Sequence, residues 1–442
     1  MIEVNFSKSI LLLALITRLV GGELVALSYF LLAGYALLGR VQVIQSLALL
    51  CFFSVLSGDI ALMKPSDSSV LRYIPIMGAT VSLLLRSRAS ITRGKLNVSL
   101  VVLATLCLGV FLLIHSILFS QMSDVSILKS VLWVTVMVVL LVAWRGLSDL
   151  EHDRLQRQLF GALVVSMLVS LPFLVIPNIG YSTNGYGFQG IFDQPQVFGL
   201  AMATLAACFI GRLSQPVQYR WLDMFLLLLC SGLLVISEAR TAGFALMLAV
   251  IVTPIIFFVF RGNARSLFRS LAWMCTILIV VWFSFSDQLS KFAFKRGDAV
   301  DITETLEESR GILMFPMIAN ILENPMSGIG FGVGSIPSER YVNRDNILGL
   351  PSGAPVEKGI LPLAVIEELG APGFLAFAFW LWMMFRRSYR AGFYPFLVLS
   401  IVFLMNLGEA TFFSTGGIGL FFLIMFTWSV TAKGRSIYKL SE

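Results

Sequence analysis

Residues 324–334 read Asn-Pro-Met-Ser-Gly-Ile-Gly-Phe-Gly-Val-Gly, and they lie within residues 286–359, the one long polar segment of an otherwise apolar chain. Connections longer than about 15 residues are uncommon unless they are functional or disordered. This segment is not of low complexity. Glycines at every second position cannot form a well-packed strand. We therefore expect a tight turn where the backbone approaches another helix, lipid or a ligand.

A helix is expected immediately before these glycines. Residues 301–304 and 305–308 both fit the capping-box pattern that starts a helix. The apolar run 312–322 continues this helix, with a kink at Pro316, and Asn324-Pro325 ends it because the residue before a proline is pushed out of the α region. Two interpretations stay open: an amphipathic helix hairpin resting on the membrane surface, or a lid over a substrate.

The composition around this segment indicates an all-α polytopic membrane protein with about 12–14 transmembrane helices. Of the 442 residues 57% are hydrophobic and 13% charged, and the mean hydropathy is +0.88. The net charge of +7 is spread between apolar runs without forming a basic face, which argues against nucleic acid as a partner. Apolar runs of spanning length fall at residues 10–38, 41–58, 69–85, 96–118, 127–144, 158–176, 197–211, 221–236, 241–260, 270–285, 360–384, 393–410 and 415–431.

Lysine and arginine cluster in every second loop, and this pattern predicts the orientation. Short loops rich in these residues remain in the cytoplasm, so the loops at 178–196 and 237–241 and the long segment face the opposite compartment. We expect three consecutive parts: a transmembrane bundle at 1–285, the external loop at 286–359, and further transmembrane helices at 360–442. The basic residues are Arg86, Arg88, Arg93, Lys95, Arg145, Arg154, Arg157, Arg212, Arg220, Arg261, Arg265, Arg269, Arg386, Arg387, Arg390, Lys433, Arg435 and Lys439.

The first apolar run has two interpretations. Residues 10–38 are long for one span and short for two, and Gly21-Gly22 lies in the middle. A re-entrant hairpin would leave the N-terminus in the cytoplasm, whereas a single tilted helix would place it outside.

Residues 190–199, Gly-Ile-Phe-Asp-Gln-Pro-Gln-Val-Phe-Gly, form the first of three further external motifs. Either they support a site, with Asp193 as a candidate, or Asp193 or Gln194 caps a helix that has Pro195 in its first turn.

The second motif is the turn Ser237-Glu238-Ala239-Arg240-Thr241, which places two charges at the membrane boundary. Charge is costly there. Glu238 and Arg240 either pair with each other, or the planar guanidinium of Arg240 binds phosphate oxygens.

The third motif combines Glu357-Lys358-Gly359 with Glu367-Glu368 at the external start of a span. A carboxylate at a dry boundary is a candidate general base, because burial raises its pKa toward the working range. The alternative is helix capping and ion pairing with Lys358.

Other kinds of site find little support in the sequence. It contains no Walker-type loop, and its two histidines are too few and too separated for a metal site. Asp298 and Asp301 are not clustered with other metal ligands, and no Ser-His-Asp set can be assembled, His115 near a span end being the sole candidate. We expect neither a cofactor nor a metal.

The order of these motifs resembles the O-antigen ligase/polymerase family of bacterial inner-membrane proteins, by motif over about residues 185–380 and by architecture over the whole chain. The motifs are Gly190…Phe192…Pro195, then Ser237–Thr241, then Arg310 with Asn324-Pro325-x-x-Gly328-x-Gly330-x-Gly332, then Glu368-x-Gly370-x-x-Gly373.

The resemblance implies a metal-independent glycosyltransferase of the inner membrane that uses undecaprenyl-diphosphate-linked glycans in the periplasm. It also implies that Arg240 and Arg310 hold the diphosphate. We expect Glu357, Lys358 and Glu368 to be catalytic, with support from Asp193, Glu238, Gly328, Gly330 and Gly332. Expected partners are the lipid-linked glycan, membrane lipids, a chain-length regulator and a flippase.

One feature departs from the family pattern. Members commonly carry a histidine about ten residues before the Glu-x-Gly motif, and it is favoured as catalytic in the ligases, whereas this chain has Glu357-Lys358-Gly359 there. We therefore expect a polysaccharide polymerase, with a ligase that transfers glycan to lipid A–core as the alternative. A transporter or flippase of lipid-linked sugars is the alternative from another class, but it should carry charges along the centres of its spans.

Overall fold

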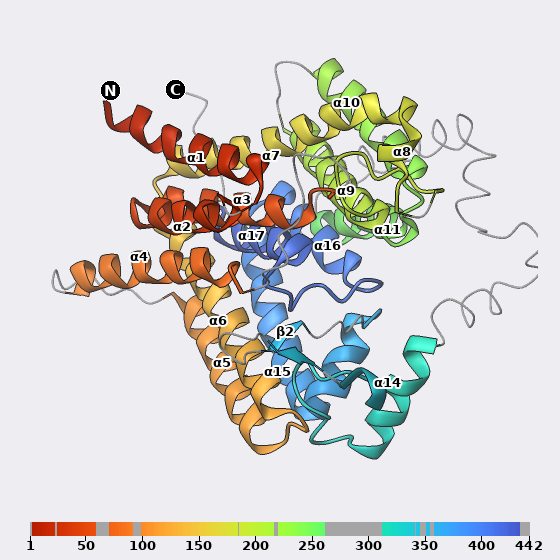
Figure 1. The fold of residues 1–442 in the computed structure, drawn as a ribbon. Coiled ribbons are helices and arrows are strands. Elements are labelled where there is room, and N and C mark those ends of the chain that lie inside the picture. The colour runs from red at the N-terminus through yellow and green to blue at the C-terminus, as the bar shows by residue number, and fades with distance from the viewer. Residues whose placement is uncertain are drawn as a thin grey trace, which may run out of the picture. The chain divides into compact units, whose positions relative to one another are not determined.

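The computed structural model describes residues 2–22, 24–58, 70–91, 99–183, 185–215, 220–260, 312–340, 342–344, 351–353 and 358–433, with the side chains of a few of these left out. The chain is an all-α membrane protein (Figure 1). Among the described residues, six helices are long and apolar enough to cross a membrane, and shorter apolar helices accompany them. The expected span at 270–285 lies outside the described residues.

The chain divides into two compact units that interleave along the sequence. The first unit comprises residues 1–155, 312–384 and 409–428, and the second comprises residues 156–311, 385–408 and 429–442. The three consecutive parts expected from the sequence remain a prediction. The helices are α1 (Ile2–Val20), α2 (Leu24–Leu37), α3 (Arg40–Val55), α4 (Tyr73–Ile91), α5 (Leu100–Leu118), α6 (Ser123–Arg145), α7 (Asp149–Ser170), η1 (Leu171–Val175), α8 (Pro177–Gly180), α9 (Pro195–Leu213), α10 (Arg220–Ile236), α11 (Arg240–Val259), α14 (Ile312–Glu323), η3 (Pro337–Arg340), α15 (Leu361–Ala391), α16 (Phe393–Met405) and α17 (Gly417–Thr431).

The first apolar run forms two helices rather than one. Gly21 and Gly22 adopt φ values of 78° and 61°, which end α1 before α2 begins. The two helices pack against each other, and α2 also packs against α3 and α4. The run is therefore a helical hairpin and not a single helix, whereas its re-entrant course and the side of the N-terminus stay predictions.

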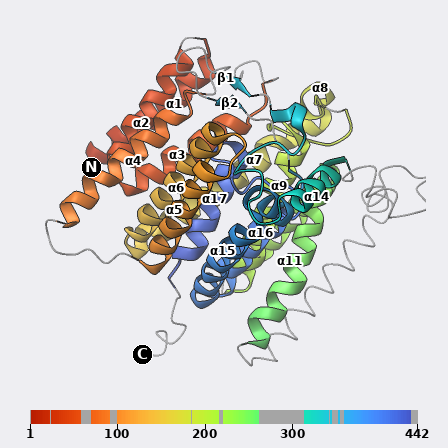
Figure 2. The same cartoon turned by 90° about the horizontal axis from the view of Figure 1, so that it is seen from below.

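Helices α5, α6, α15 and α17 lie close together in the first unit (Figure 2). Aromatic side chains pack between them. The Trp133 indole of α6 lies 5.6 Å from that of Trp380 in α15, and the Trp380 Nε1–H donates to Thr105 Oγ1 of α5 at 3.0 Å. The rings of Phe377, Phe412 and Phe413 extend this cluster to Phe331, in the segment after α14.

A two-stranded antiparallel pair adds a small external feature to this unit. β1 (Asn343–Arg344) pairs with β2 (Pro351–Gly353), and Arg344 forms an ion pair with Asp124 at the start of α6. The expected amphipathic helix is α14, which ends at Glu323 as Asn324-Pro325 predicts. The capping boxes before it lie outside the described residues.

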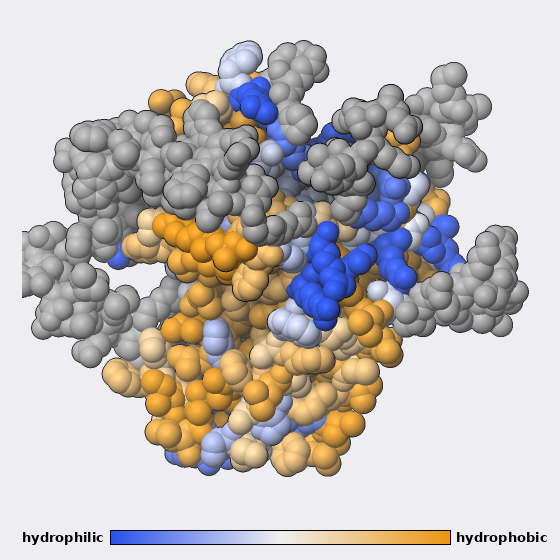
Figure 3. Space-filling view, turned by 180° about the vertical axis from the view of Figure 1, so that it is seen from behind, coloured by the Kyte–Doolittle hydropathy of each residue, from blue (hydrophilic) through white to orange (hydrophobic). Residues whose placement is uncertain are grey.

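The second unit is built around α9, which is buried against α10, α11 and α16. Arg212 at the end of α9 forms an ion pair with Asp223 of α10, with 3.2 Å between Nη2 and Oδ1. Much of the surface visible in Figure 3 is hydrophobic. Leu100, Val110 and Leu118 on α5 are 69%, 56% and 66% exposed, as expected for side chains that face lipid.

Candidate functional site

Helix α15 is broken immediately after Glu367 and Glu368. Gly370 adopts φ 65° and ψ −175°, so the helix stops there and resumes at Ala371-Pro372. A break inside an apolar helix leaves backbone carbonyl groups without their usual partners. Within a membrane such backbone is tolerated only where protein or a water-filled cavity satisfies it.

The glycine segment, residues 328–334, supplies hydrogen-bond donors to the backbone at this break. The Ile329 N–H donates to the Glu367 carbonyl at 2.9 Å, and the Gly330 N–H donates to the Glu368 carbonyl at 3.0 Å. Ala371 N–H in turn donates to Pro325 O at 2.9 Å. The expected tight turn against another helix is therefore confirmed.

Glycine is required here for two reasons, which Gly328 illustrates. Its φ of 64° lies in the left-handed region, and a Cβ at this position would lie 2.6 Å from the carbonyl carbon of Glu368. Gly332 makes a similarly close approach to the side chain of Lys129. The residues between the glycines, Ile329 and Phe331, point into the core and are fully buried.

Four charged side chains meet at this break: Lys129 of α6, Lys358, Glu367 and Glu368, which we call the lysine–glutamate cluster. Lys358 Nζ lies 2.8 Å from Glu367 Oε2 and 3.1 Å from Glu368 Oε1. Lys129 Nζ lies 3.8 Å from Glu368 Oε1. The two glutamates occupy the last turn before the break, where the helix dipole disfavours negative charge, so the ammonium groups offset an unfavourable position.

The two carboxylates have different environments. Glu367 is 0% exposed and accepts three hydrogen bonds, from Asn320 Nδ2 at 2.7 Å, Ser335 Oγ at 3.0 Å and Lys358 Nζ at 2.8 Å. Glu368 is 2% exposed, and among the described residues its buried Oε2 has no hydrogen-bond partner. Glu367 therefore links α15 to α14 and to the residues after the glycine segment, whereas Glu368 keeps one carboxylate oxygen that can accept a further hydrogen bond.

The two lysines also differ. The side chain of Lys358 is 4% exposed, and that of Lys129 is 32% exposed. Lys129 Nζ lies 4.9 Å from the centre of the Phe331 ring, which gives a cation–π contact. The cluster is thus closed on the side of Lys358 and reaches the surface at Lys129.

His115 holds the start of the glycine segment. Its Nε2 lies 2.6 Å from the carbonyl oxygen of Ser327, which can only accept, so Nε2 carries the proton. The other ring nitrogen, Nδ1, is buried without a hydrogen-bond partner among the described residues. His115 therefore belongs to this region of the first unit, although it is distant in sequence from the other residues there.

Lys358 and Glu368 are the two predicted catalytic residues that the structure brings together. Their contact agrees with the ion-pairing alternative of the sequence analysis, and a pair of this kind does not by itself exclude a role in chemistry. Glu357, Arg310, Asp298 and Asp301 lie outside the described residues. Within the described part of the chain, no group of three or more His, Cys, Asp or Glu side chains is arranged to hold a metal ion.

The other two predicted motifs meet within the second unit. The Phe188 N–H donates to Ile236 O at 3.1 Å, and a Cβ on Gly187 would lie 2.7 Å from Ser237 O. Gly199 packs against Ala239 in the same way. The loop before α9 and the turn before α11 therefore form one surface, with Gln194 as the N-cap residue of α9 and no side-chain capping bond.

Glu238 and Arg240 do not form the mutual ion pair that was one alternative; both side chains are described, and they form no ion pair with each other. Glu238 is exposed and has a φ of 55°, and its carbonyl accepts the Arg240 N–H at 2.9 Å. The half-exposed Arg240 guanidinium stands at the first residue of α11.

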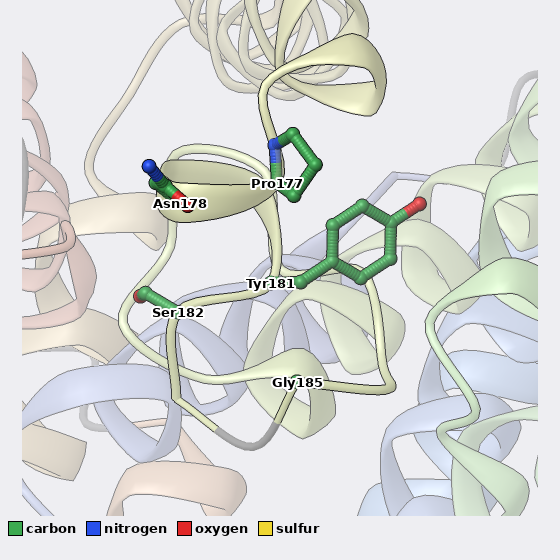
Figure 4. A pocket seen from close by; sticks show the side chains of 5 residues that line it. All are labelled: Pro177, Asn178, Tyr181, Ser182 and Gly185. Carbon is green, nitrogen blue, oxygen red and sulfur yellow. The ribbon is translucent and has the colours of Figure 1, made fainter.

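A pocket of about 480 Å³ opens in the loop before α9 (Figure 4). Asn178 and Ser182 lie on one side of the loop, and the rings of Pro177 and Tyr181 lie on the other. Further along this loop, burial raises the pKa of Asp193 to about 6. Its Oδ1 is buried without a hydrogen-bond partner among the described residues.

Sequence reasoning did not identify Lys129, Asn320 or Ser335 as site residues. Lys129 carried one usable signal, because it is the single charged residue in the apolar run 127–144, and a charge inside a span is costly. Asn320 and Ser335 carried none, since polar residues near helix ends are common. No protein-family model and no curated protein matches this sequence.

Proposed function

We propose that this membrane protein is a glycosyltransferase that joins undecaprenyl-diphosphate-linked oligosaccharide repeat units into a polysaccharide, on the periplasmic side of the bacterial inner membrane. The observation that carries the proposal is the lysine–glutamate cluster at the break in α15. Ionisable groups inside apolar helices are expensive, and they mark functional sites by default. The motif resemblance supplies the substrate class.

The reaction needs a base and a group that stabilises the leaving diphosphate. In the proposed step, a hydroxyl oxygen of the acceptor sugar bonds to the anomeric carbon of the donor, and the bond from that carbon to the diphosphate oxygen breaks. Glu368 accepts the hydroxyl proton through its unpartnered oxygen. Lys358 holds Glu368 in place from 3.1 Å.

The leaving group is a lipid diphosphate, and fixed cations can stabilise its developing charge without a metal. We assign this role to Arg240 and Arg310, because the planar guanidinium matches phosphate oxygens. Arg240 suits the role in having no ionic partner among the described side chains.

Helix α6 supports the proposed side of the membrane. Arg40, Arg86 and Gly146, which follows Arg145, line one pocket at the C-terminal end of this helix. Lys129 lies 16 residues before Arg145, which is roughly 24 Å along the helix axis. If the basic end faces the cytoplasm, as basic loops do, the lysine–glutamate cluster faces the periplasm.

The test uses purified protein in lipid nanodiscs, supplied with a lipid-diphosphate-linked repeat unit, with product length measured on a gel. Wild type is expected to produce a ladder of lengths. Glu368→Gln should lower the rate at least about 100-fold, because general bases contribute that much. The matched control is Glu323→Gln, an exposed glutamate at the end of α14, which should leave the rate unchanged.

Other results would contradict the proposal. A single transfer to lipid A–core without a ladder indicates a ligase, and movement of unmodified lipid-linked sugar across the bilayer indicates a flippase. A full ladder from Glu368→Gln would remove Glu368 as the base. Excess chelator should leave the rate unchanged; a loss that magnesium restores would refute metal-independent transfer and direct attention to Asp298 and Asp301.

A further inference from the structure

Lys129 has the features of a binding group rather than of a structural ion pair. Its Nζ is 3.8 Å from Glu368 Oε1, beyond hydrogen-bond distance, so none of its three N–H donors has an acceptor within hydrogen-bond distance among the described residues. Lys358 already contacts both carboxylates, at 2.8 and 3.1 Å. Lys358 therefore makes the shorter contacts with the glutamates, and Lys129 makes a longer ion pair with Glu368 alone.

The glycine segment fixes where this ammonium lies. The Phe331 ring supports Nζ from 4.9 Å, and the backbone at Gly332 is pressed against the aliphatic stem of Lys129. Phe331 in turn is fully buried against Phe413, with 4.9 Å between ring centres. A long and flexible side chain is thus held against the glycine segment while 32% of it remains exposed, as expected for a group that receives a ligand.

Apolar side chains are exposed on the helix that leads into the glycine segment. Helix α14, which leads into the glycine segment, exposes Phe315 by 65% and Leu322 by 76%, and Met326 just beyond it is 67% exposed. Gln121, in the turn between α5 and α6, donates its N–H to Ile329 O at 3.0 Å, so the start of α6 adjoins this segment. The glycine segment thus connects a cation on α6 to a helix with exposed apolar side chains, a combination that suits a ligand with an anionic head and a long apolar chain.

We propose that Lys129 binds a phosphate group of the polyprenyl diphosphate carried by the substrate, and that the exposed side chains of α14 contact its prenyl chain. This inference rests on the proposed function for the identity of the lipid. It assigns to α6 a cation that positions the donor next to Glu368.

The binding test uses the full chain in nanodiscs of phosphatidylcholine, titrated with a short prenyl diphosphate. Loss of a charged contact to phosphate should weaken the affinity of Lys129→Met at least about 10-fold, whereas Lys129→Arg should stay within about 3-fold of wild type. The corresponding prenyl alcohol, which has no phosphate, should bind wild type and Lys129→Met equally. Arg387→Met, which removes an exposed cation elsewhere, serves as the control.

Two results would overturn the inference. One is equal affinity of Lys129→Met and wild type for the prenyl diphosphate, and the other is displacement of the prenyl diphosphate by an equal concentration of phosphatidylglycerol, which would assign Lys129 to ordinary lipid headgroups. Should Lys129→Met not fold, wild type is labelled with a photoreactive prenyl diphosphate and digested. Label on residues 123–145, 312–326 or 328–334 supports the site, and label confined to other segments refutes it.

The two proposals fail in different ways. If wild type makes polymer and Lys129→Met binds the prenyl diphosphate normally, the binding role is wrong and the enzymatic function stands. If the prenyl diphosphate binds through Lys129 but wild type makes no polymer, the site stands and the function is wrong. Glu368→Gln should retain binding within about 3-fold of wild type while losing polymer, because it removes the base and leaves the cation in place.

Discussion

The two regions that carry the charged motifs differ in whether their charged side chains are buried and paired. In the first unit, Lys358, Glu367 and Glu368 are almost fully buried, and Lys358 Nζ lies 2.8 Å from Glu367 and 3.1 Å from Glu368. In the second unit, Glu238 and Arg240 lie side by side in a turn and do not pair. A buried charge needs an oppositely charged partner to offset its desolvation penalty, whereas a charge at the membrane boundary stays partly hydrated and is stable without one. On the proposed function, a bound anion is the partner of Arg240, which forms no ion pair among the described residues.

The largest effect should come from breaking the buried set. Lys358→Met leaves two carboxylates without their shared cation, so we expect it to destabilise the fold by about 3–5 kcal/mol, measured by thermal unfolding in detergent. The double variant Lys358→Met/Glu367→Gln removes one charge of each sign and should recover part of that loss. Equal stability of wild type and Lys358→Met would mean that the ion pairs contribute nothing to the fold.

The second effect concerns the unpaired cation. Arg240→Lys keeps the charge but loses the planar fork, so on the proposed function it should lower the polymerisation rate on the order of 100-fold, about 3 kcal/mol. Stability should change little, because the side chain has no ionic partner among the described residues to lose. Polymer is measured at equal membrane abundance, with Arg387→Lys as control. Near-normal polymer would exclude a role in holding the diphosphate.

The third effect compares two glycines with the same backbone strain. Gly328 has φ 64° and is pressed against Glu368, whereas Gly185 of the second unit has φ 74° and nothing within 4 Å of the point where a Cβ would lie. Gly185→Ala should cost about 1–2 kcal/mol from strain alone. Gly328→Ala should cost a further 1–3 kcal/mol or so, because the Cβ forces the segment off α15. Equal costs in thermal unfolding would show that the docking is loose.

The smallest effect is a pH dependence in the second unit. Burial raises the pKa of Asp193 from 3.8 to about 6, so the folded protein holds this proton more tightly than the unfolded chain. Stability due to this group is therefore fully present below about pH 4 and is lost as pH rises through about 6. At neutral pH, Asp193→Asn should raise the free energy of unfolding by about 1–2 kcal/mol, after allowing for partial exposure, and with it the unfolding temperature. At about pH 4 the substitution should change neither quantity. An unchanged pH profile would place the carboxyl in water.

Local features of the chain could be predicted well. Apolar runs predicted the helices, since spanning a membrane requires continuous apolar sequence, and the run at 127–144 corresponds to α6. The prediction from Asn324-Pro325 that α14 ends there was correct, and so was the turn at Gly328, because proline and glycine act through their own backbone geometry. The break in α15 at Gly370 was not predicted, because one glycine within a helix has several uses.

What the sequence determined by itself was therefore the membrane class, most helix boundaries, and the positions where charge stands at high cost. Only the tertiary structure decided which charges meet. Lys129 and Glu368 are separated by more than 200 residues, and His115 and Ser327 by 212. A lone lysine in an apolar run reveals its own desolvation cost but not its partner, because the partner depends on how α6, the glycine segment and α15 pack. Helix ends, turns and the cost of burying a charge depend on residues close together in the sequence, whereas a site depends on contacts between distant segments.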